Sequence, residues 1–271
     1  MAAPSTKYTS KLAGKRVLVL GGTSGIGYSV AEAAVEFGAH VIVSSSKPAN
    51  VASAVESLKA SYPPGLNGRG PQAPIGHVCD LSDSEKIEEN LESLLKVAAG
   101  DSKINHIVVT AGDVPKVSPL SEITAEEVRK LGDVRFVGSI ILAKLIPRYM
   151  DLDPANSFTL TGGVNTAKPM PGWTLMAGIG GSLRGIIRGL SVDLKPLRVN
   201  VVEPGAIQTP LLERNLGDAS TREAVLASFA TSTTVGTIGQ SEDVAEAYLY
   251  LMKDRYVTGA IIESNGGRLL A

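Results

Sequence analysis

The stretch that decides the fold is Arg16-Val-Leu-Val-Leu-Gly-Gly-Thr-Ser-Gly-Ile-Gly27, which a helix-like segment follows over 28–38. Residues 17–20 are continuous aliphatics, as a parallel strand covered on both faces requires. The glycines at 21, 22, 25 and 27 let a phosphate approach the backbone and the positive end of the next helix. We therefore predict a strand, a tight turn and a helix that bind a pyrophosphate; the alternative is an ordinary glycine-rich loop. The residues expected at the pyrophosphate are Gly21, Thr23, Ser24, Gly25, Ile26 and Gly27.

The end of the second predicted strand distinguishes between two dinucleotides. In dinucleotide-binding folds an acidic residue about 20 positions beyond the glycines binds the ribose 2'-hydroxyl of NAD, whereas a 2'-phosphate needs hydroxyl donors and a cation. Here Ser45, Ser46 and Lys47 occupy that distance. The pattern favours NADP(H), although serines at this point are also suited to cap the next helix.

Apolar periodicity predicts strands and helices that alternate along the whole chain. The expected strands are 17–20, 39–43, 75–78, 104–109, 157–161, 198–202 and 260–263, and the expected helices are 28–38, 49–60, 86–98, 124–150, 173–194, 222–229 and 242–252. This alternation predicts an α/β fold: a single-domain Rossmann-type doubly wound parallel sheet of about seven strands with helices on both faces. We expect residues 1–11 to form a flexible leader and residues 12–271 to form the one domain, with ligands outside the carboxyl ends of the strands.

Composition limits the classes of partner. The 271 residues are 44% hydrophobic with a formal net charge of -1, and Lys and Arg are scattered, so we expect no nucleic-acid partner. Cys79 is the one cysteine, which excludes an intrachain disulfide and suits a reducing compartment. No apolar run approaches the roughly 18 residues of a membrane span. We expect a cytoplasmic protein without a metal ion or a membrane partner, acting on a small-molecule substrate.

The predicted helix 173–194 contains five glycines, at 178, 180, 181, 185 and 189. Each glycine costs about 1 kcal/mol relative to alanine, so the helix must recover that energy by close packing. Packing on the sheet or on a twin helix across a dimer axis would do so, and the second predicts a homodimer or homotetramer. The alternative is a partly broken helix.

Two further strand ends supply candidate cofactor contacts. Asp80 and Leu81 follow the third strand, where the Asp80 carboxylate can accept from the adenine amino group or cap a helix that begins near Ser82. Ala111 and Gly112 follow the fourth strand and would turn beneath the cofactor.

These elements together resemble the short-chain dehydrogenase/reductase family over nearly the whole chain. The family's Thr-Gly-x-x-x-Gly-x-Gly motif is similar to residues 20–27 with Leu20 for threonine, its Asn-Ala-Gly element to residues 110–112, and its Pro-Gly-x-x-x-Thr element to residues 204–209. The resemblance implies that the Ile207 backbone and the Thr209 hydroxyl hold the nicotinamide carboxamide.

The resemblance also implies that the family's usual proton-handling residues are missing. Its Ser, Tyr and Lys positions fall on Gly163, Met176 and Gly180, and its Asn position falls on Arg135. Methionine cannot donate a proton, and glycine cannot lower the pKa of a neighbouring donor. Carbonyl reduction would therefore need another proton donor. The candidates are Thr161, Asp113, Lys168 and bound water.

Arg135 and Trp173 are the remaining candidate site residues. A guanidinium at a strand edge can clamp a carboxylate or hold a developing oxyanion, or it can form a salt bridge with Glu127 or Asp133. Trp173 lies behind two prolines as a pocket wall or a packing residue. The Arg135 and Trp173 pattern resembles an atypical branch of the family, the fungal natural-product enzymes of the malbrancheamide and paraherquamide Diels–Alderase type. That branch has an acidic residue where this chain has Met170.

Three functions follow from these patterns. The first is an NADPH-dependent reductase of a secondary-metabolite intermediate, acting on an iminium or an activated carbonyl without the usual Tyr and Lys. The second is a non-redox catalyst of cyclisation or isomerisation that retains NADP as a structural or electrostatic element. The third is a non-catalytic NADP-binding scaffold.

Overall fold

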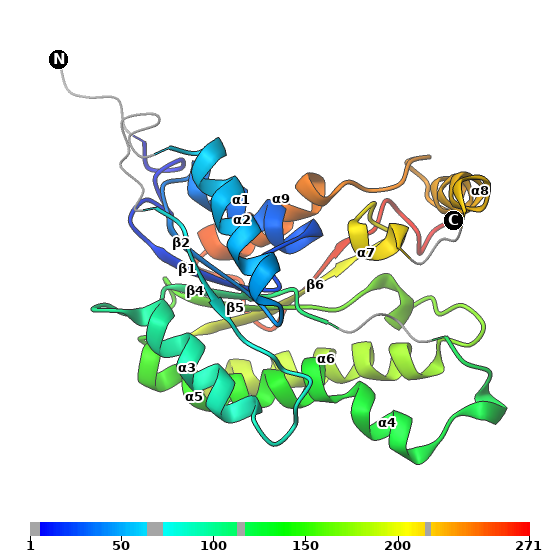
Figure 1. Ribbon diagram of the computed structural model, residues 1–271, viewed down its shortest axis with the longest axis horizontal. Helices are drawn as coiled ribbons and strands as arrows, with labels where there is room; N and C mark the ends of the chain where they lie inside the picture. Colours follow the sequence, from blue (N-terminus) through cyan, green and yellow to red (C-terminus); the bar gives the residue numbers. More distant parts are fainter. Residues whose placement is uncertain (1–5, 64–72, 113–116, 215–217) are drawn as a thin grey trace.

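Seven parallel strands form one sheet at the centre of the computed structural model, which describes residues 6–63, 73–112, 117–214 and 218–271 (Figure 1). The strand order is β3-β2-β1-β4-β5-β6-β7, so the direction of winding reverses between β1 and β4. The strands are β1 (Arg16–Leu20), β2 (His40–Ser45), β3 (Ile75–Val78), β4 (His106–Val109), β5 (Ser157–Thr161), β6 (Arg198–Pro204) and β7 (Ile261–Ser264).

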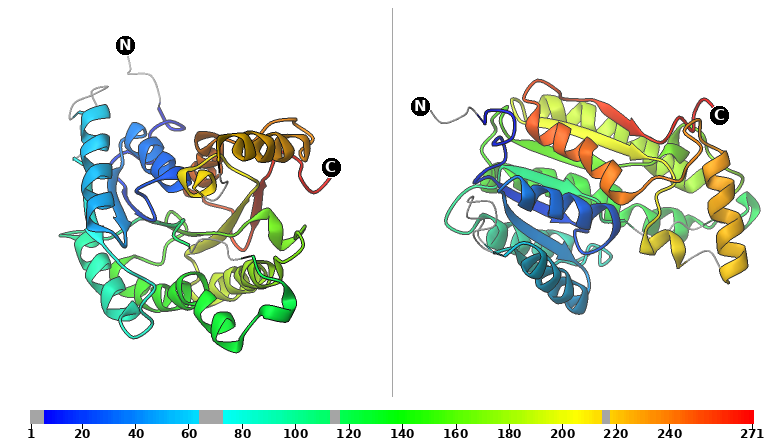
Figure 2. Two further views of the ribbon diagram at one scale, coloured as in Figure 1. Left: turned by 45° about the vertical axis from the view of Figure 1, so that its right-hand side comes forward. Right: turned by 90° about the horizontal axis from the view of Figure 1, so that it is seen from above.

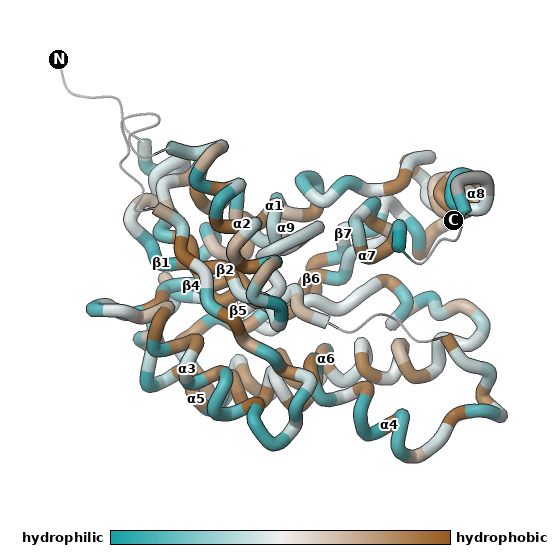
Figure 3. Tube along the Cα trace, in the orientation of Figure 1, coloured by the Kyte–Doolittle hydropathy of each residue, from teal (hydrophilic) through white to brown (hydrophobic). Residues whose placement is uncertain are grey.

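Helices cover both faces of this sheet (Figures 1 and 2). On one face lie α1 (Gly25–Glu36), α2 (Pro48–Ser61) and α9 (Ser241–Lys253), and on the other lie α3 (Ile87–Ala99), α5 (Gly138–Tyr149) and α6 (Thr174–Asp193). Each face has its own cluster of buried apolar side chains, and the hydrophobic stretches in Figure 3 follow the central strands. The predicted α/β doubly wound parallel sheet with helices on both faces is confirmed.

Shorter elements gather beyond the carboxyl ends of the strands, on the right in Figure 1. They are η2 (Leu120–Glu122), α4 (Ala125–Leu131), η3 (Asp133–Val137), η4 (Val164–Thr166), α7 (Pro210–Glu213) and α8 (Ala219–Thr231). None of the residues of α4 is buried, so its stability comes from its ends: Thr124 and Glu127 form a capping box. These elements surround the edge at which the sheet's ligand is expected.

The expected single helix over 124–150 is wrong. The chain forms α4, then the π-helical turn η3, then α5. The amide of Val137 donates to the Gly132 carbonyl five residues earlier, which inserts one extra residue into the turn. Helical spacing of Val134 and Val137 survives this insertion, so the sequence pattern did not reveal it. A π-turn of this kind is frequent at functional sites, and Arg135 lies within it.

Several boundaries also differ from the prediction. The fourth strand begins at His106, and Ile104 pairs through an isolated bridge with Met150. The sixth strand continues to Pro204, which brings Glu203 into the sheet. Residues 6–10 form hydrogen-bonded turns and Leu12 is fully buried. Within the described chain, no helix combines the length and the apolarity needed to cross a membrane.

The glycines of α6 divide into two kinds. Gly180 faces Thr166, whereas a Cβ added at Gly178, Gly181, Gly185 or Gly189 would meet no atom within 4 Å. The helix is continuous from Thr174 to Asp193, so the partly broken alternative is wrong. Packing on the sheet does not account for the four open glycines, which share one face at helical spacing. The twin-helix explanation, and with it a homodimer or homotetramer, stays a prediction.

A large side chain on this face should break the predicted assembly. We expect Gly185→Gln to lower the mass measured by light scattering to that of the 28.2 kDa monomer, because the added atoms would separate the twin helices. Ala52→Gln, on the exposed side of α2, is the matched control and should leave the mass unchanged. A wild-type chain that is already monomeric would contradict the prediction.

Candidate active site at the carboxyl edge of the sheet

The glycine turn between β1 and α1 is packed too closely for side chains. A Cβ at Gly27 would collide with the Gly21 carbonyl oxygen and the Thr110 hydroxyl, and a Cβ at Gly21 would lie 2.5 Å from the Ala111 nitrogen. Gly21 and Gly25 have φ angles of 83° and 51°, in the left-handed region that favours glycine. The turn therefore depends on glycine at these positions, and it presents bare backbone at the strand edge.

The first turn of α1 has the polarity that an anion requires. Ser24 is its N-cap residue and makes no side-chain capping hydrogen bond, and the turn contains no acidic residue. The amide groups of this turn and the positive end of the helix dipole are thus available to a phosphate. Thr23 and Ile26 lie half-buried in the same turn, and the Thr209 methyl group would be 3.0 Å from a Cβ at Gly25. These residues fit a pyrophosphate.

The end of β2 lies beside this turn, because the amides of Gly21 and Gly22 both donate to the Ser44 carbonyl. Ser45 is half-buried, and the next two residues, Ser46 and Lys47, are exposed. Lys47 itself is the N-cap residue of α2, and no side-chain capping bond is made there. The alternative that the serines cap this helix is therefore wrong, and their hydroxyl groups lie where a ribose phosphate is expected.

Asp80 and Leu81 lie at the next strand end. One oxygen of the Asp80 carboxylate accepts from the amide and the hydroxyl of Ser82 at 2.9 and 2.8 Å, which closes a turn. The helix after it begins at Ile87, so Asp80 does not cap a helix. The neighbouring Cys79 is buried, and that burial raises the pKa of its thiol to about 12, so it is a packing residue rather than a nucleophile.

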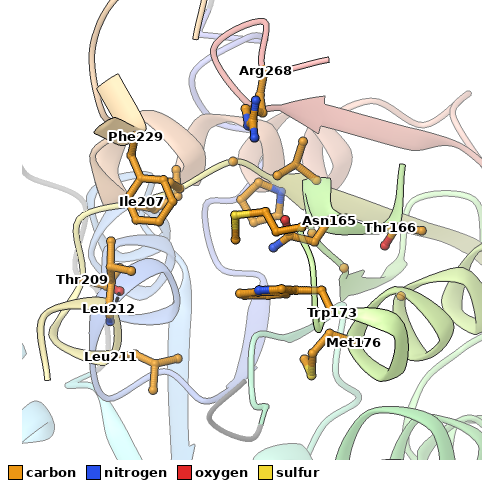
Figure 4. A pocket seen from close by; sticks show the side chains of 18 of the residues that line it. Asn165, Thr166, Trp173, Met176, Ile207, Thr209, Leu211, Leu212, Phe229 and Arg268 are labelled. Atoms are coloured by element: carbon orange, nitrogen blue, oxygen red, sulfur yellow. Dashed lines mark hydrogen bonds between the residues drawn. The ribbon is translucent and has the colours of Figure 1, made fainter. Parts of the chain in front are cut away.

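A cavity of about 400 Å³ lies between the glycine turn, α6 and the segments that follow β5, β6 and β7 (Figure 4). It brings together five of the residues singled out from the sequence: Ile26, Arg135, Trp173, Ile207 and Thr209. Trp173 is half-buried, and its ring lies across the middle of the cavity next to Asn165 in Figure 4. The structure thus places it as a wall of the cavity.

The three positions that correspond to the family's Ser, Tyr and Lys all line this cavity. They are Gly163, Met176 and Gly180. A Cβ at Gly180 would collide with the hydroxyl of Thr166, so this position has no room for a lysine. Met176 lies below Trp173 in Figure 4. The wall that faces the expected nicotinamide therefore offers a thioether and bare backbone, neither of which donates a proton.

Arg135 extends from the π-turn η3 across the floor of the site. Its guanidinium lies against Gly112, where a Cβ would collide with it, and one of its nitrogens donates to the Thr161 carbonyl at 3.3 Å. Ala111 and Gly112, which follow β4, are half-buried. The structure therefore fixes a cation directly at the junction of β4 and β5.

Thr161 is not brought into the cavity. Its hydroxyl donates to the Val109 carbonyl at 2.6 Å and lies 2.7 Å from the Tyr248 hydroxyl. A hydroxyl has one proton, so Tyr248 is the donor in the second bond. Burial raises the pKa of Tyr248, and its side chain is fully buried, so this pair is a packed network rather than a proton source. The expectation for Thr161 as a proton donor is corrected accordingly.

Lys168 is also directed away from the cavity. Its ammonium group donates to the carbonyl oxygens of Arg268, at 3.1 Å, and Ala271. The residue is absent from the described lining of the cavity, so the structure corrects its expected role as a proton donor. Asp113, the third candidate, lies outside the described residues.

Glu203 has a carboxylate next to Gly162, one of the residues that line the cavity. It is 1% exposed, and both of its oxygens accept from Arg184, at 2.8 and 2.6 Å. These bonds raise the pKa of Arg184 and tie α6 to β6. Glu203 is thus committed to a structural pair. In the described parts of the chain, no group of three or more His, Cys, Asp or Glu side chains gathers to hold a metal ion.

Several lining residues were missed by the sequence reasoning. They are Asn165, Leu211, Leu212, Phe229 and Arg268, from four separate segments. The two leucines and Phe229 come from α7 and α8, whose apolar residues gave only a weak periodic signal. Arg268 follows two glycines near the end of the chain, and no local pattern links it to Trp173, which lies about a hundred residues earlier.

A family model for an SDR-like Rossmann domain matches residues 8–271. The chain belongs to the short-chain dehydrogenase/reductase family. The family accounts for the strand order, the glycine turn and the position of the cavity at the carboxyl edge of the sheet.

Similar proteins share the whole length of the chain. It is 46% identical to the short-chain dehydrogenase/reductase malC of Malbranchea aurantiaca, over 99% of each chain, and 39% identical to fsr5 of Gibberella fujikuroi, over 98% of each. The solved structure of the MalC reductase/Diels–Alderase superposes with a TM-score of 0.91, covering 98% of this chain and 100% of that one. The structure of a dehydrogenase/reductase from Sinorhizobium meliloti, which is 26% identical, superposes with a TM-score of 0.79 and covers 97% of this chain and 98% of that one.

Because the chain has one tryptophan, its fluorescence should report on the cavity. We expect camphor, a compact apolar ketone, to shift the emission to shorter wavelength and to lower acrylamide quenching about two-fold, because a bound ligand shields the ring. Trp173→Phe should abolish the signal. Camphor binding detected by calorimetry without any change in emission would contradict the assignment of Trp173 to the wall.

Proposed function

We propose that the protein is an NADPH-dependent reductase of a biosynthetic intermediate whose acceptor is an iminium or an activated carbonyl. One observation carries the proposal: the three proton-handling positions of the family line the cavity as Gly163, Met176 and Gly180. A substrate reduced here has to complete the reaction without a proton from those positions.

The chain's own residues support the cofactor. The bare glycine turn and the first turn of α1 would hold the pyrophosphate, and Ser45, Ser46 and Lys47 would hold the 2'-phosphate. When bound, the cofactor would supply hydride equivalents. Ile207 and Thr209 lie on the cavity side of the turn, where they would position the nicotinamide ring against the substrate.

An iminium acceptor suits this site best. When hydride adds to an iminium carbon, the electron pair of the C=N bond passes to nitrogen and the product is a neutral amine, so no proton is needed at that step. A ketone would instead give an alkoxide, which the sulfur of Met176 cannot protonate. The apolar side chains of Trp173, Leu211 and Phe229 line the cavity and would pack against the apolar part of such a substrate.

A second function has one observation in its favour. The solved relative that is 44% identical is described as a reductase/Diels–Alderase, and this chain superposes on it with a TM-score of 0.91. An apolar cavity of about 400 Å³ would hold a folded substrate for cyclisation as well as for reduction. In that case the dinucleotide would serve as a structural or electrostatic element.

Lys47 should discriminate between the two nicotinamide dinucleotides. We expect Lys47→Ala to weaken NADPH binding about ten-fold and to leave NADH binding unchanged, because only the 2'-phosphate loses a charged partner. Lys59→Ala, exposed in the last turn of α2, is the matched control. The dissociation constants come from fluorescence titration of the reduced cofactors. An equal loss for both cofactors would contradict the assignment.

The reduction rates of two acceptors should distinguish iminium reduction from carbonyl reduction. The first acceptor is 3,4-dihydroisoquinoline, a cyclic imine, in mildly acidic buffer where its nitrogen is protonated to an iminium. With NADPH, we expect it to be reduced at least about 100-fold faster than 1-tetralone, a ketone of similar size, because a general acid contributes that much to carbonyl reduction. Absorbance of the reduced cofactor and product mass are measured together. Equal rates would contradict the proposal, and an isomerised product without cofactor oxidation would favour the second function.

A further inference from the structure

Arg268, in the segment over 265–271, lines the cavity. The segment follows β7, and Figure 4 shows the Arg268 guanidinium directed into the cavity from the side opposite Met176. Among the residues that the structure describes, this guanidinium makes no hydrogen bond and no ion pair. Arginine is costly to place at an apolar cavity without a partner, because its five donors lose water there.

The backbone of this segment is fixed at several points. The Gly266 carbonyl accepts from the amide of Val235 and the hydroxyl of Thr234, each at 3.2 Å. The Lys168 ammonium holds the carbonyl oxygens of Arg268 and Ala271. Lys168, which the sequence suggested as a proton donor, thus anchors the backbone of Arg268.

The charges around the cavity show what Arg268 can bind. The described lining has two cations, Arg135 and Arg268, and no carboxylate. Arg135 donates to the Thr161 carbonyl, and Glu203, which is not among the lining residues, is paired through both oxygens with Arg184. An iminium alone would be repelled by Arg268. A carboxylate on the same substrate would offset that charge and would match the planar fork of a guanidinium with two parallel hydrogen bonds.

We propose that the cavity takes an apolar substrate that carries a carboxylate, that Arg268 binds this carboxylate, and that Lys168 is its positioning residue. The inference rests on the proposed iminium reduction only for the identity of the reacting group. It places the carboxylate at the 265–271 side and the reacting carbon on the side of Met176 and the glycine turn.

The test compares two probes that differ by one group: 3,4-dihydroisoquinoline and 3,4-dihydroisoquinoline-3-carboxylate. Calorimetric titration of the protein without cofactor gives each dissociation constant, so the result does not depend on redox turnover. We expect the carboxylate probe to bind at least about ten-fold tighter to the wild-type protein.

Variants then assign the preference to its residues. We expect Arg268→Gln to bring the ratio of the two dissociation constants to about one and Arg268→Lys to retain part of it, since lysine keeps the charge but not the fork. Lys168→Gln should reduce the ratio and Lys168→Arg should restore it, with binding of the parent probe unchanged in both. Arg255→Gln, exposed after α9 and outside the described lining of the cavity, is the control.

The outcomes separate this inference from the proposed function. A ratio near one in the wild-type protein, or a preference that survives Arg268→Gln, would overturn the inference even if the imine is reduced. An Arg268-dependent preference without any NADPH oxidation would leave the inference standing and would contradict the reductase.

Discussion

The close approach of two backbone segments at the centre of the sheet determines what the rest of the structure can do. The start of α1 packs on the end of β1 so tightly that Gly27 has no room for a side chain against Gly21 and Thr110. This contact lies where the winding of the sheet reverses, between β1 and β4. It leaves backbone amides and a helix end together at the strand edge, a combination that suits an anion.

The cavity wall has Gly163, Met176 and Gly180 where the family has its usual proton-handling residues. The thioether of Met176 donates no proton. Here the neighbouring position is also closed, because the Thr166 hydroxyl fills the space that a lysine at Gly180 would need. The hydroxyl groups of Thr161 and Tyr248 are committed to hydrogen bonds within the core. We therefore expect this cavity to act on a substrate by positioning it and by electrostatic stabilisation.

The sequence predicted those parts of the structure that depend on local patterns. The glycine turn could be foreseen because tight turns and helix starts have residue requirements within a few positions. The parallel sheet followed from alternating apolar runs. The π-turn at Arg135 could not be foreseen, because one inserted residue hardly disturbs the helical spacing of Val134 and Val137. Arg268 could not be foreseen either, because its place depends on contacts with residues distant in sequence.

The case of Lys168 explains why residue type alone was misleading. An ammonium group near a strand edge is a reasonable proton donor on chemical grounds, and the sequence offers no reason to prefer another use. The fold directs it toward two carbonyl oxygens and away from the substrate. Its charge then stabilises the backbone of the segment over 265–271, and the segment's cation that lines the cavity is Arg268, in addition to Arg135 from η3. The planar fork of a guanidinium suits a carboxylate, which is the ligand we propose for this side of the cavity.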